Sequence, residues 1–180
     1  FEEKLRIADV YENLKKTANG EIVSDNSKIT FERYIMGSYF EQVLYYANLR
    51  FSKMTGGRYE IVRGESRDKR ISAGLEISVR DNFNNKERDI SSLSGGESFQ
   101  ASLALALGLS DIIQQRNGGI RLDSIFIDEG FGSLDNDSLA SAIETLNDLT
   151  GNGNRLVGII SHISELKNSI GNKIEVVGTK

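Results

Sequence analysis

The chain has 180 residues, a formal net charge of −4, and neither cysteine nor proline. This length is enough for one domain with its own core, and the lack of cysteine excludes a disulfide framework and a cysteine-ligated zinc site. The acidic balance gives no overall attraction to nucleic acid, and no apolar run reaches the roughly 18 residues that span a membrane, so we expect a cytoplasmic protein without membrane contact.

Two helices are predicted at the N-terminal end. Residues 1–18 carry apolar residues between charges, and residues 21–29 form a polar connector. Thr30 is placed to cap a second helix that runs to about residue 54, where Gly56-Gly57 ends it. The apolar positions of this helix recur every three or four residues and share one face: Ile35, Tyr39, Val43, Tyr46 and Leu49.

Two alternating segments follow. Residues 58–63 and 75–80 alternate apolar and polar side chains, which predicts a half-exposed antiparallel pair of strands. Residues 81–92 are polar and charged, and we expect them to form a loop.

The C-terminal half changes to the alternation of strands and helices that is typical of α/β domains. Its two short apolar runs are expected to be buried parallel strands. In chain order we expect a helix at 97–115, a strand at 124–128, an amphipathic helix through Leu139, Ile143, Leu146 and Leu149, a strand at 156–160, a short helix at 163–170 and a strand at 173–177.

The first candidate site is the sequence LSGGE at residues 93–97. Gly95 and Gly96 let the backbone approach a ligand, and the first N–H groups of the following helix suit a phosphate. Ser94 can add a hydroxyl donor. The alternative is a purely structural capping box, in which Ser94 and Glu97 bond to each other's backbone.

A second candidate site is the acidic pair at the end of the apolar strand 124–128. Ligands of α/β sheets bind beyond the carboxyl ends of the strands. Asp128 is placed to hold Mg²⁺, and Glu129 to orient or deprotonate an attacking water. The alternative is a solvated acidic turn.

The segment Ser133-Leu134-Asp135 follows the acidic pair and precedes a predicted helix. Asp135 or Asn136 can cap that helix. The same segment can also contact an opposing subunit, and the two roles are compatible.

His162 is the single histidine of the chain and follows the second apolar strand. A lone histidine is usually structural. At the carboxyl end of a core strand, however, it can bond to a γ-phosphate.

No GxxxxGK[ST] phosphate loop is present, nor any Gly-Lys dipeptide. A complete nucleotide site therefore needs another stretch of polypeptide. The chain also begins Phe-Glu-Glu without an initiator Met, and we expect it to be a fragment.

Residues 93–111, 124–135 and 158–162, in this order, resemble the C-terminal lobe of an ABC-type ATPase head. The string DEGFGSLD resembles most closely the SbcC exonuclease-subunit family, relatives of the SMC proteins. The resemblance covers about residues 30–180. ABC transporters usually have proline at the position of Gly130. Relatives often carry an arginine at the position of Ser98, so a switch that depends on it is not transferred.

The resemblance implies an α/β fold, the C-terminal lobe of an ABC-type head with a mostly parallel sheet, flanking helices and N-terminal helices from the base of a coiled coil. Residues 1–55 would be the end of the arm and residues 56–180 the lobe. The partners implied are the N-terminal Walker A lobe of the same protein, a second head in a homodimer, an SbcD-type nuclease, and DNA with double-stranded ends or hairpins.

The resemblance also implies residue roles, with ATP and Mg²⁺ as cofactors. The signature residues Ser94, Gly95, Gly96 and Glu97 would bind the ATP of the opposite head. Glu129 and His162 would be catalytic and Asp128 would bind the metal. Ser133, Leu134 and Asp135 would form the D-loop at the head–head contact.

Two other functions remain open. An SMC- or RecN-like ATPase would organise DNA without a nuclease partner, whereas a scaffold would dimerise without catalysis. The intact set Asp128, Glu129 and His162 argues against the scaffold. By itself, the fragment is expected to lack ATPase activity and to expose a sheet edge and apolar surface.

Overall fold

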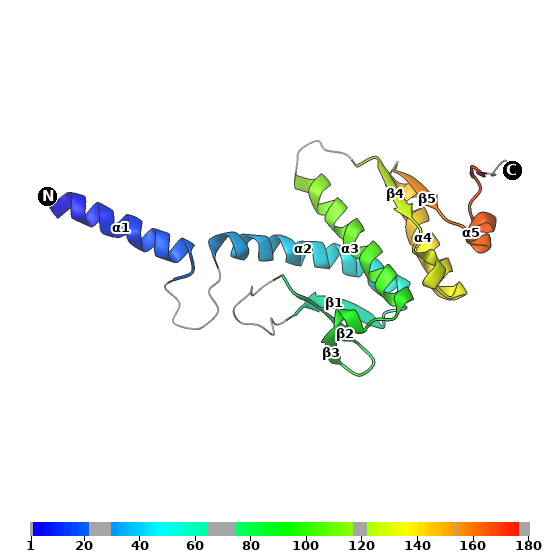
Figure 1. The fold of residues 1–180 in the computed structure, drawn as a ribbon, viewed down its shortest axis with the longest axis horizontal. Helices are drawn as coiled ribbons and strands as arrows, with labels where there is room; N and C mark the ends of the chain where they lie inside the picture. The colour runs from blue at the N-terminus through cyan, green and yellow to red at the C-terminus, as the bar shows by residue number, and fades with distance from the viewer. Residues whose placement is uncertain (1, 22–29, 65–74, 117–121, 154, 177–180) are drawn as a thin grey trace.

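The computed structural model describes residues 2–21, 30–64, 75–116, 122–153 and 155–176. Helix α1 extends away from the rest of the chain, which is built around three longer helices and two small sheets (Figure 1). In chain order the elements are α1 (Glu2–Ala18), α2 (Phe31–Met54), β1 (Tyr59–Arg63), β2 (Ile77–Asp81), β3 (Lys86–Asp89), α3 (Gly95–Arg116), β4 (Ser124–Asp128), α4 (Asn136–Gly153), β5 (Leu156–Ile160) and α5 (Ser164–Ser169). No helix of the described residues is both long and apolar enough to cross a bilayer.

Helix α2 has the ends that its sequence predicts. The hydroxyl oxygen of Thr30 accepts a hydrogen bond from the Arg33 N–H at 3.3 Å. After Met54, Gly56 and Gly57 take φ angles of 59° and 79°, which glycine adopts at little cost and which stop the helix.

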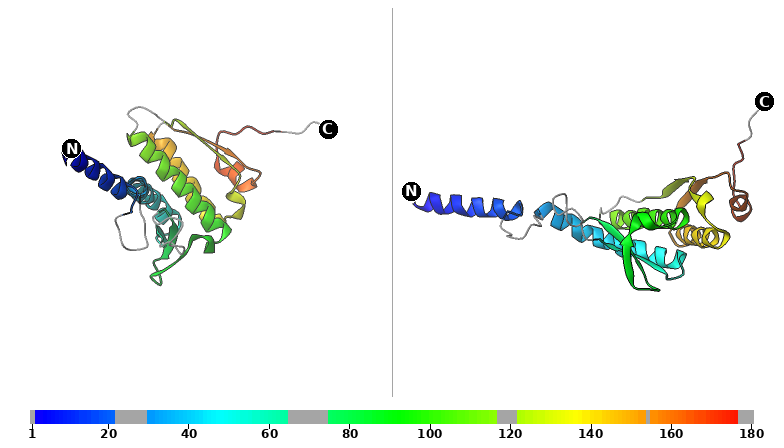
Figure 2. Two further views of the ribbon diagram at one scale, coloured as in Figure 1. Left: turned by 60° about the vertical axis from the view of Figure 1, so that its left-hand side comes forward. Right: turned by 60° about the horizontal axis from the view of Figure 1, so that its bottom comes forward.

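The core lies where α2 and α3 cross (Figure 2). Gly108 of α3 meets the backbone of α2, and a Cβ at this position would lie 2.7 Å from the Val43 carbonyl oxygen and 2.8 Å from the Ala47 nitrogen. The absence of a side chain therefore sets the distance between the two helices. Phe51 of α2 is fully buried beside this contact.

Strands β1, β2 and β3 form an antiparallel sheet in that order. The side chain of Asn48 in α2 covers the free edge of β1: its Nδ2 donates to the Ile61 carbonyl at 2.7 Å, and its Oδ1 accepts from the Ile61 N–H at 2.8 Å. One amide thus supplies the two hydrogen bonds that a further strand would make.

The prediction of a loop at residues 81–92 was wrong. Asp81 belongs to β2, residues 86–89 form β3, and residues 90–92 form a 3₁₀ turn. The charged sequence of β3 shows no apolar alternation because this strand lies at the sheet edge, where pairing with β2 rather than burial holds it.

Strands β4 and β5 pair in parallel, with Ser124 opposite Leu156 and Asp128 opposite Ile160. The prediction that both strands are buried is wrong for one face of this sheet. Phe126, Leu156 and Ile160 are 71%, 63% and 60% exposed, because none of the described residues covers their side of the sheet. The other face, with Ile125 and Ile127, packs on the core.

The last predicted strand is also wrong in the part of the chain that the structure describes. Residues 173–176 have no regular structure, and Ile174 and Val176 are almost fully exposed. Position 177 lies outside the described residues. An alternating sequence forms a strand only where a neighbouring strand can pair with it, and no described strand pairs with residues 173–176. The helix before it, α5, forms as predicted.

Candidate nucleotide site

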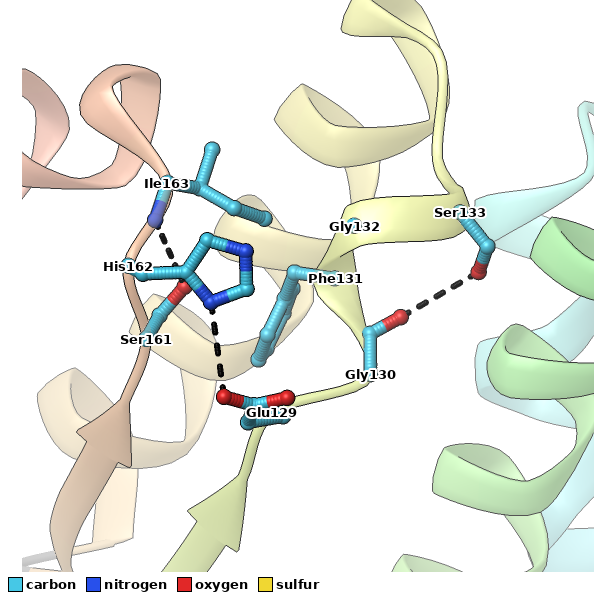
Figure 3. A pocket seen from close by; sticks show the side chains of 8 residues that line it. All are labelled: Glu129, Gly130, Phe131, Gly132, Ser133, Ser161, His162 and Ile163. Atoms are coloured by element: carbon cyan, nitrogen blue, oxygen red, sulfur yellow. Dashed lines mark hydrogen bonds and ion pairs between the residues drawn. The ribbon is translucent and has the colours of Figure 1, made fainter.

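The parallel pairing of β4 and β5 brings the two loops after these strands together. The pairing continues one step beyond the strands, where the Glu129 N–H donates to the Ile160 carbonyl at 2.9 Å. Residues 129–133 and 161–163 then line a hollow of about 200 Å³ at the carboxyl end of the sheet (Figure 3). This is the end at which α/β sheets bind ligands.

Glu129 and His162 face each other across this hollow. The Nδ1 of His162 lies 3.3 Å from Oε1 of Glu129, and the two side chains are 79% (His162) and 64% (Glu129) exposed. In the tautomer with its proton on Nδ1, His162 donates to the carboxylate and presents Nε2 to solvent. Protonation of both nitrogens turns Nε2 into a donor suited to a phosphate oxygen.

The turn after β4 has an unusual backbone. Glu129 has a φ of 56° and Gly130 a φ of 90°, both in the left-handed region. Proline, whose φ is held near −65°, cannot adopt the backbone of Gly130. The glycine at this position therefore reflects a turn different from one that accepts proline.

The segment at residues 94–97 forms the predicted capping box at the start of α3. The Ser94 N–H donates to Oε2 of Glu97 at 2.9 Å, and the Glu97 N–H donates to the Ser94 hydroxyl at 3.3 Å. The first N–H groups of α3, at Gly95 and Gly96, have no acceptor within the helix and carry partial positive charge. These two groups suit an anion, and beside them the oxygen of the Ser94 hydroxyl accepts the Glu97 N–H.

The Glu97 carboxylate is tied to the antiparallel sheet as well. Burial raises its pKa, but hydrogen bonds from Ser94 and the Tyr59 hydroxyl, with the charge of Arg88, outweigh burial and leave the pKa below its ordinary value. Burial and the bond to Glu97 in turn raise the pKa of Tyr59. The guanidinium carbons of Arg58 and Arg88 lie 4.7 and 5.3 Å from the centre of the Tyr59 ring.

The glycines at the start of α3 pack against the segment after the acidic pair. A Cβ on Gly95 would lie 3.4 Å from the Cβ of Ser133, and one on Gly96 would lie 2.9 Å from the Ser133 carbonyl oxygen and 3.3 Å from Cδ2 of Leu134. In Figure 3 the Ser133 hydroxyl points to the Gly130 carbonyl, to which it donates a hydrogen bond at 3.2 Å. The two predicted motifs are therefore in contact within one chain.

Asp135 caps α4, as one of its two predicted roles requires. Its carboxylate accepts from the Ser138 N–H at 2.8 Å, and this bond is the main cause of its lowered pKa. The carboxylate remains exposed.

The carboxylates near the hollow are enough to bind Mg²⁺ together with a nucleotide, but not to bind a metal ion with protein ligands alone. Among the residues that the structure describes, no three His, Cys, Asp or Glu side chains converge into a metal cage. A nucleotide-bound Mg²⁺ needs only one or two carboxylates, because phosphates and water complete its shell. Asp128, exposed at the end of β4, fits this requirement as a single ligand.

The structure thus gathers the predicted residues at one end of the lobe: Glu129 faces His162, and Gly95 and Gly96 pack on Ser133 and Leu134. Phe99 and Tyr59 were not among the predicted site residues. Phe99 lies two residues after Glu97 and has the pattern of one more apolar helix position. The sequence signal for the left-handed turn was Gly130, at a position where ABC transporters usually have proline.

The comparisons of this chain with known proteins agree on one family. A family model described as "SbcC/RAD50-like, Walker B motif" matches residues 65–148. A relative from Staphylococcus epidermidis, the SbcC component of the nuclease SbcCD, is 55% identical over 153 residues, which cover 85% of this chain and 15% of the relative. A relative of the same name from Staphylococcus aureus is 54% identical over 158 residues, 87% of this chain and 16% of the relative. The chain therefore spans about a sixth of the length of these relatives.

Solved structures with the same fold are heads of SMC proteins. One, described as "Structural biochemistry of ATP-driven dimerization and DNA stimulated activation of SMC ATPases", aligns with a TM-score of 0.63 at 15% identity over 82% of this chain and 83% of that chain. The Smc head domain of Pyrococcus furiosus, solved with an extended coiled coil and the C-terminal domain of ScpA, aligns with a TM-score of 0.53 at 17% identity over 93% of this chain and 39% of that chain. The predicted fold class, the C-terminal lobe of an ABC-type ATPase head, is confirmed.

Proposed function

Because this chain belongs to the SbcC family, we propose that it is the C-terminal part of an ATPase head that binds and hydrolyses ATP in a dimer of heads. The N-terminal lobe of the same protein supplies the phosphate loop that these 180 residues lack. ATP turnover in turn controls a nuclease that processes DNA ends or hairpins.

The contact between His162 Nδ1 and Glu129 Oε1, 3.3 Å apart at the carboxyl ends of two paired strands, carries this proposal. A carboxylate held by a histidine at this edge is suited to orient a water molecule or accept its proton. His162 would also bond to a γ-phosphate. Asp128 would hold Mg²⁺, which would neutralise charge on the phosphates.

The start of α3 would serve a second nucleotide, held by the opposite head. Gly95 and Gly96 would offer N–H groups to its γ-phosphate, and the capping box of Ser94 and Glu97 would keep the first turn of the helix ordered. Residues 133–135 would lie at the contact between heads. Each chain would therefore contribute to two ATP sites.

The same proposal divides the chain into residues 1–55, the end of a coiled-coil arm, and residues 56–180, the lobe. Helix α1 supports an arm, since none of its residues is buried and its apolar side chains are exposed. An SbcD-type nuclease is the partner expected from the names of the relatives, which are subunits of the nuclease SbcCD.

The decisive experiment is ATP hydrolysis by the complete two-lobe protein and its Glu129→Gln variant. We expect the variant to lose turnover by at least about 100-fold and to accumulate as an ATP-bound head dimer, because the amide binds but cannot accept a proton. Glu165→Gln, an exposed carboxylate in the first turn of α5, is the matched control. Unchanged turnover in Glu129→Gln would remove Glu129 from the reaction.

Two further measurements separate the alternatives. The chain alone should not hydrolyse ATP, whereas turnover on mixing with the N-terminal lobe would establish a two-lobe site. Capture of a metallo-phosphoesterase by the complete protein would favour the nuclease assembly. Its absence would favour an SMC- or RecN-like ATPase.

A further inference from the structure

The ring of Phe99 connects the start of α3 to the turn that carries Glu129. A Cβ on Gly130 would overlap this ring, with Cδ2 of Phe99 only 2.5 Å away. The ring also packs edge-on against Phe131, with centroids 4.7 Å apart and planes at 60°. Phe131 is itself 1% exposed, so Phe99 is seated on a fixed part of the core.

The turn under Phe99 needs support from outside itself. Glutamate seldom adopts a φ of 56°, and here it is followed by a glycine at 90°. Such conformations persist where surrounding contacts hold them, and they cluster at functional sites. The backbone bond from the Glu129 N–H to Ile160 holds one side of the turn, and the Phe99 ring covers Gly130 on the other.

The first two turns of α3 meet the segment 130–134 at three successive points. Gly95 lies on Ser133, Gly96 lies on Ser133 and Leu134, and Phe99 lies on Gly130. The phosphate-facing end of α3 and the turn of Glu129 therefore fit together as one packed unit. Of these three points, the Phe99 ring is the one that reaches Gly130, next to Glu129.

We propose that Phe99 is a positioning residue, which holds the left-handed turn at Glu129 and Gly130 and thereby sets where the Glu129 carboxylate lies relative to the start of α3. This inference rests on the proposed function, because it assigns to Phe99 the placement of the proposed base. Phe99 touches no reacting atom. Its loss leaves the phosphate-binding groups in place and lets the carboxylate leave its working position.

The test uses the complete two-lobe protein with the variants Phe99→Ala, Gly130→Ala and the double variant. A misplaced carboxylate lowers kcat by about 10- to 100-fold, whereas the Kd for ATP, measured with a fluorescent ATP analogue, changes less than about twofold. Gly130→Ala lowers kcat similarly, because its Cβ meets the Phe99 ring and because alanine is strained at a φ of 90°. Phe99→Leu, which keeps an apolar side chain over the glycine, restores part of the rate.

The double variant distinguishes positioning from a general loss of stability. If Phe99 acts through Gly130, the double variant is no slower than the slower single variant. Losses that multiply would mean that the two residues act independently and would overturn the inference. Leu146→Ala, a core variant in α4, is the control: it lowers the melting temperature but leaves kcat unchanged. If Leu146→Ala lost as much kcat as Phe99→Ala, the effect of Phe99→Ala would come from lost stability, and Phe99 would not be a positioning residue.

The two proposals fail in different ways. Turnover that survives Glu129→Gln would overturn the proposed base whatever Phe99 does. Turnover that Glu129→Gln abolishes but Phe99→Ala leaves intact would overturn the role of Phe99 alone.

Discussion

The antiparallel half of the molecule and the parallel half differ in how they cover their own apolar residues and edges. Around β1 and α2, Phe51, Ile61 and Val79 are at most 1% exposed, and Asn48 supplies the hydrogen bonds of a missing edge strand. In the other half, β4 and β5 leave Phe126 and its neighbours open on one face. The antiparallel half covers its sheet and the edge of β1 within the described residues, whereas the parallel half leaves one apolar face of its sheet uncovered by them.

The difference between the two halves also separates the residues that stabilise the fold from the residues of the candidate nucleotide site. The candidate nucleotide residues lie at the end of the parallel half, where Gly95 and Gly96 at the start of α3 pack against Ser133 and Leu134. Substitutions in the first half should therefore act on folding, and substitutions on the open face should act on association. Four predictions test this division.

The largest effect is expected at the crossing of α2 and α3. Gly108→Ala places a Cβ against two backbone atoms of α2, which cannot move away as a flexible side chain can. We expect the free energy of unfolding to fall by about 3 kcal/mol, measured by urea unfolding. Ala106→Val, on the exposed side of the same helix, is the control and should cost less than about 0.5 kcal/mol. Equal losses would mean that the helices do not pack as closely as described.

The edge of β1 should be the next most sensitive place. Asn48→Leu leaves the part-buried N–H and carbonyl of Ile61 without their partners. The free energy of unfolding should fall by about 2 kcal/mol, and the Ile61 amide should lose protection from hydrogen exchange. Ser38→Ala, on the exposed surface of α2, should leave both quantities near their original values. An unprotected Ile61 amide in the unaltered protein would contradict the role of Asn48.

A smaller, pH-dependent effect is expected at Glu97. Its folded pKa lies below the ordinary value, so its contribution to stability is present above about pH 4.5 and is lost as the pH falls through the folded pKa. Glu97→Gln should lower the free energy of unfolding by about 1 kcal/mol at neutral pH. The difference from the unaltered protein should shrink in acid, which urea unfolding at about pH 7, 5 and 3.5 would show. A difference that grew on acidification would have the wrong sign.

The smallest effect on folding is expected on the open face. Phe126 is largely exposed already and rests on Gly158, so Phe126→Ser should change the free energy of unfolding by no more than about 0.5 kcal/mol. It should instead reduce self-association of the chain in analytical ultracentrifugation, because an exposed apolar patch is removed. A loss as large as that of Asn48→Leu would show that the face is covered in the chain itself.

Much of the architecture could be predicted from local signals. Thr30 and the glycine pair after Met54 mark the ends of α2, and the capping-box spacing of Ser94 and Glu97 marks the start of α3. These signals act within a few residues, so they operate whatever the rest of the chain does. The order of motifs also indicated the family, and the SbcC relatives confirmed it.

Strand partners and covered faces could not be predicted in the same way. The sequence of β3 is charged throughout and forms a strand because β2 lies beside it, whereas residues 173–176 alternate as a strand does but pair with no described strand. The prediction of burial failed for the same reason. The apolar runs of β4 and β5 were expected to be covered on both faces of their sheet, but none of the described residues lies over one of these two faces.

The sequence alone determined the helices, the strand pair β1 and β2, the family, and the residue types at the candidate nucleotide site, because each depends on neighbours in the chain. Only the tertiary structure decided that His162 meets Glu129, that Gly108 sets the helix crossing, and that Phe99 lies on Gly130. These contacts join residues that lie far apart in the chain, and their geometry follows from how helices and strands pack, which no local pattern encodes.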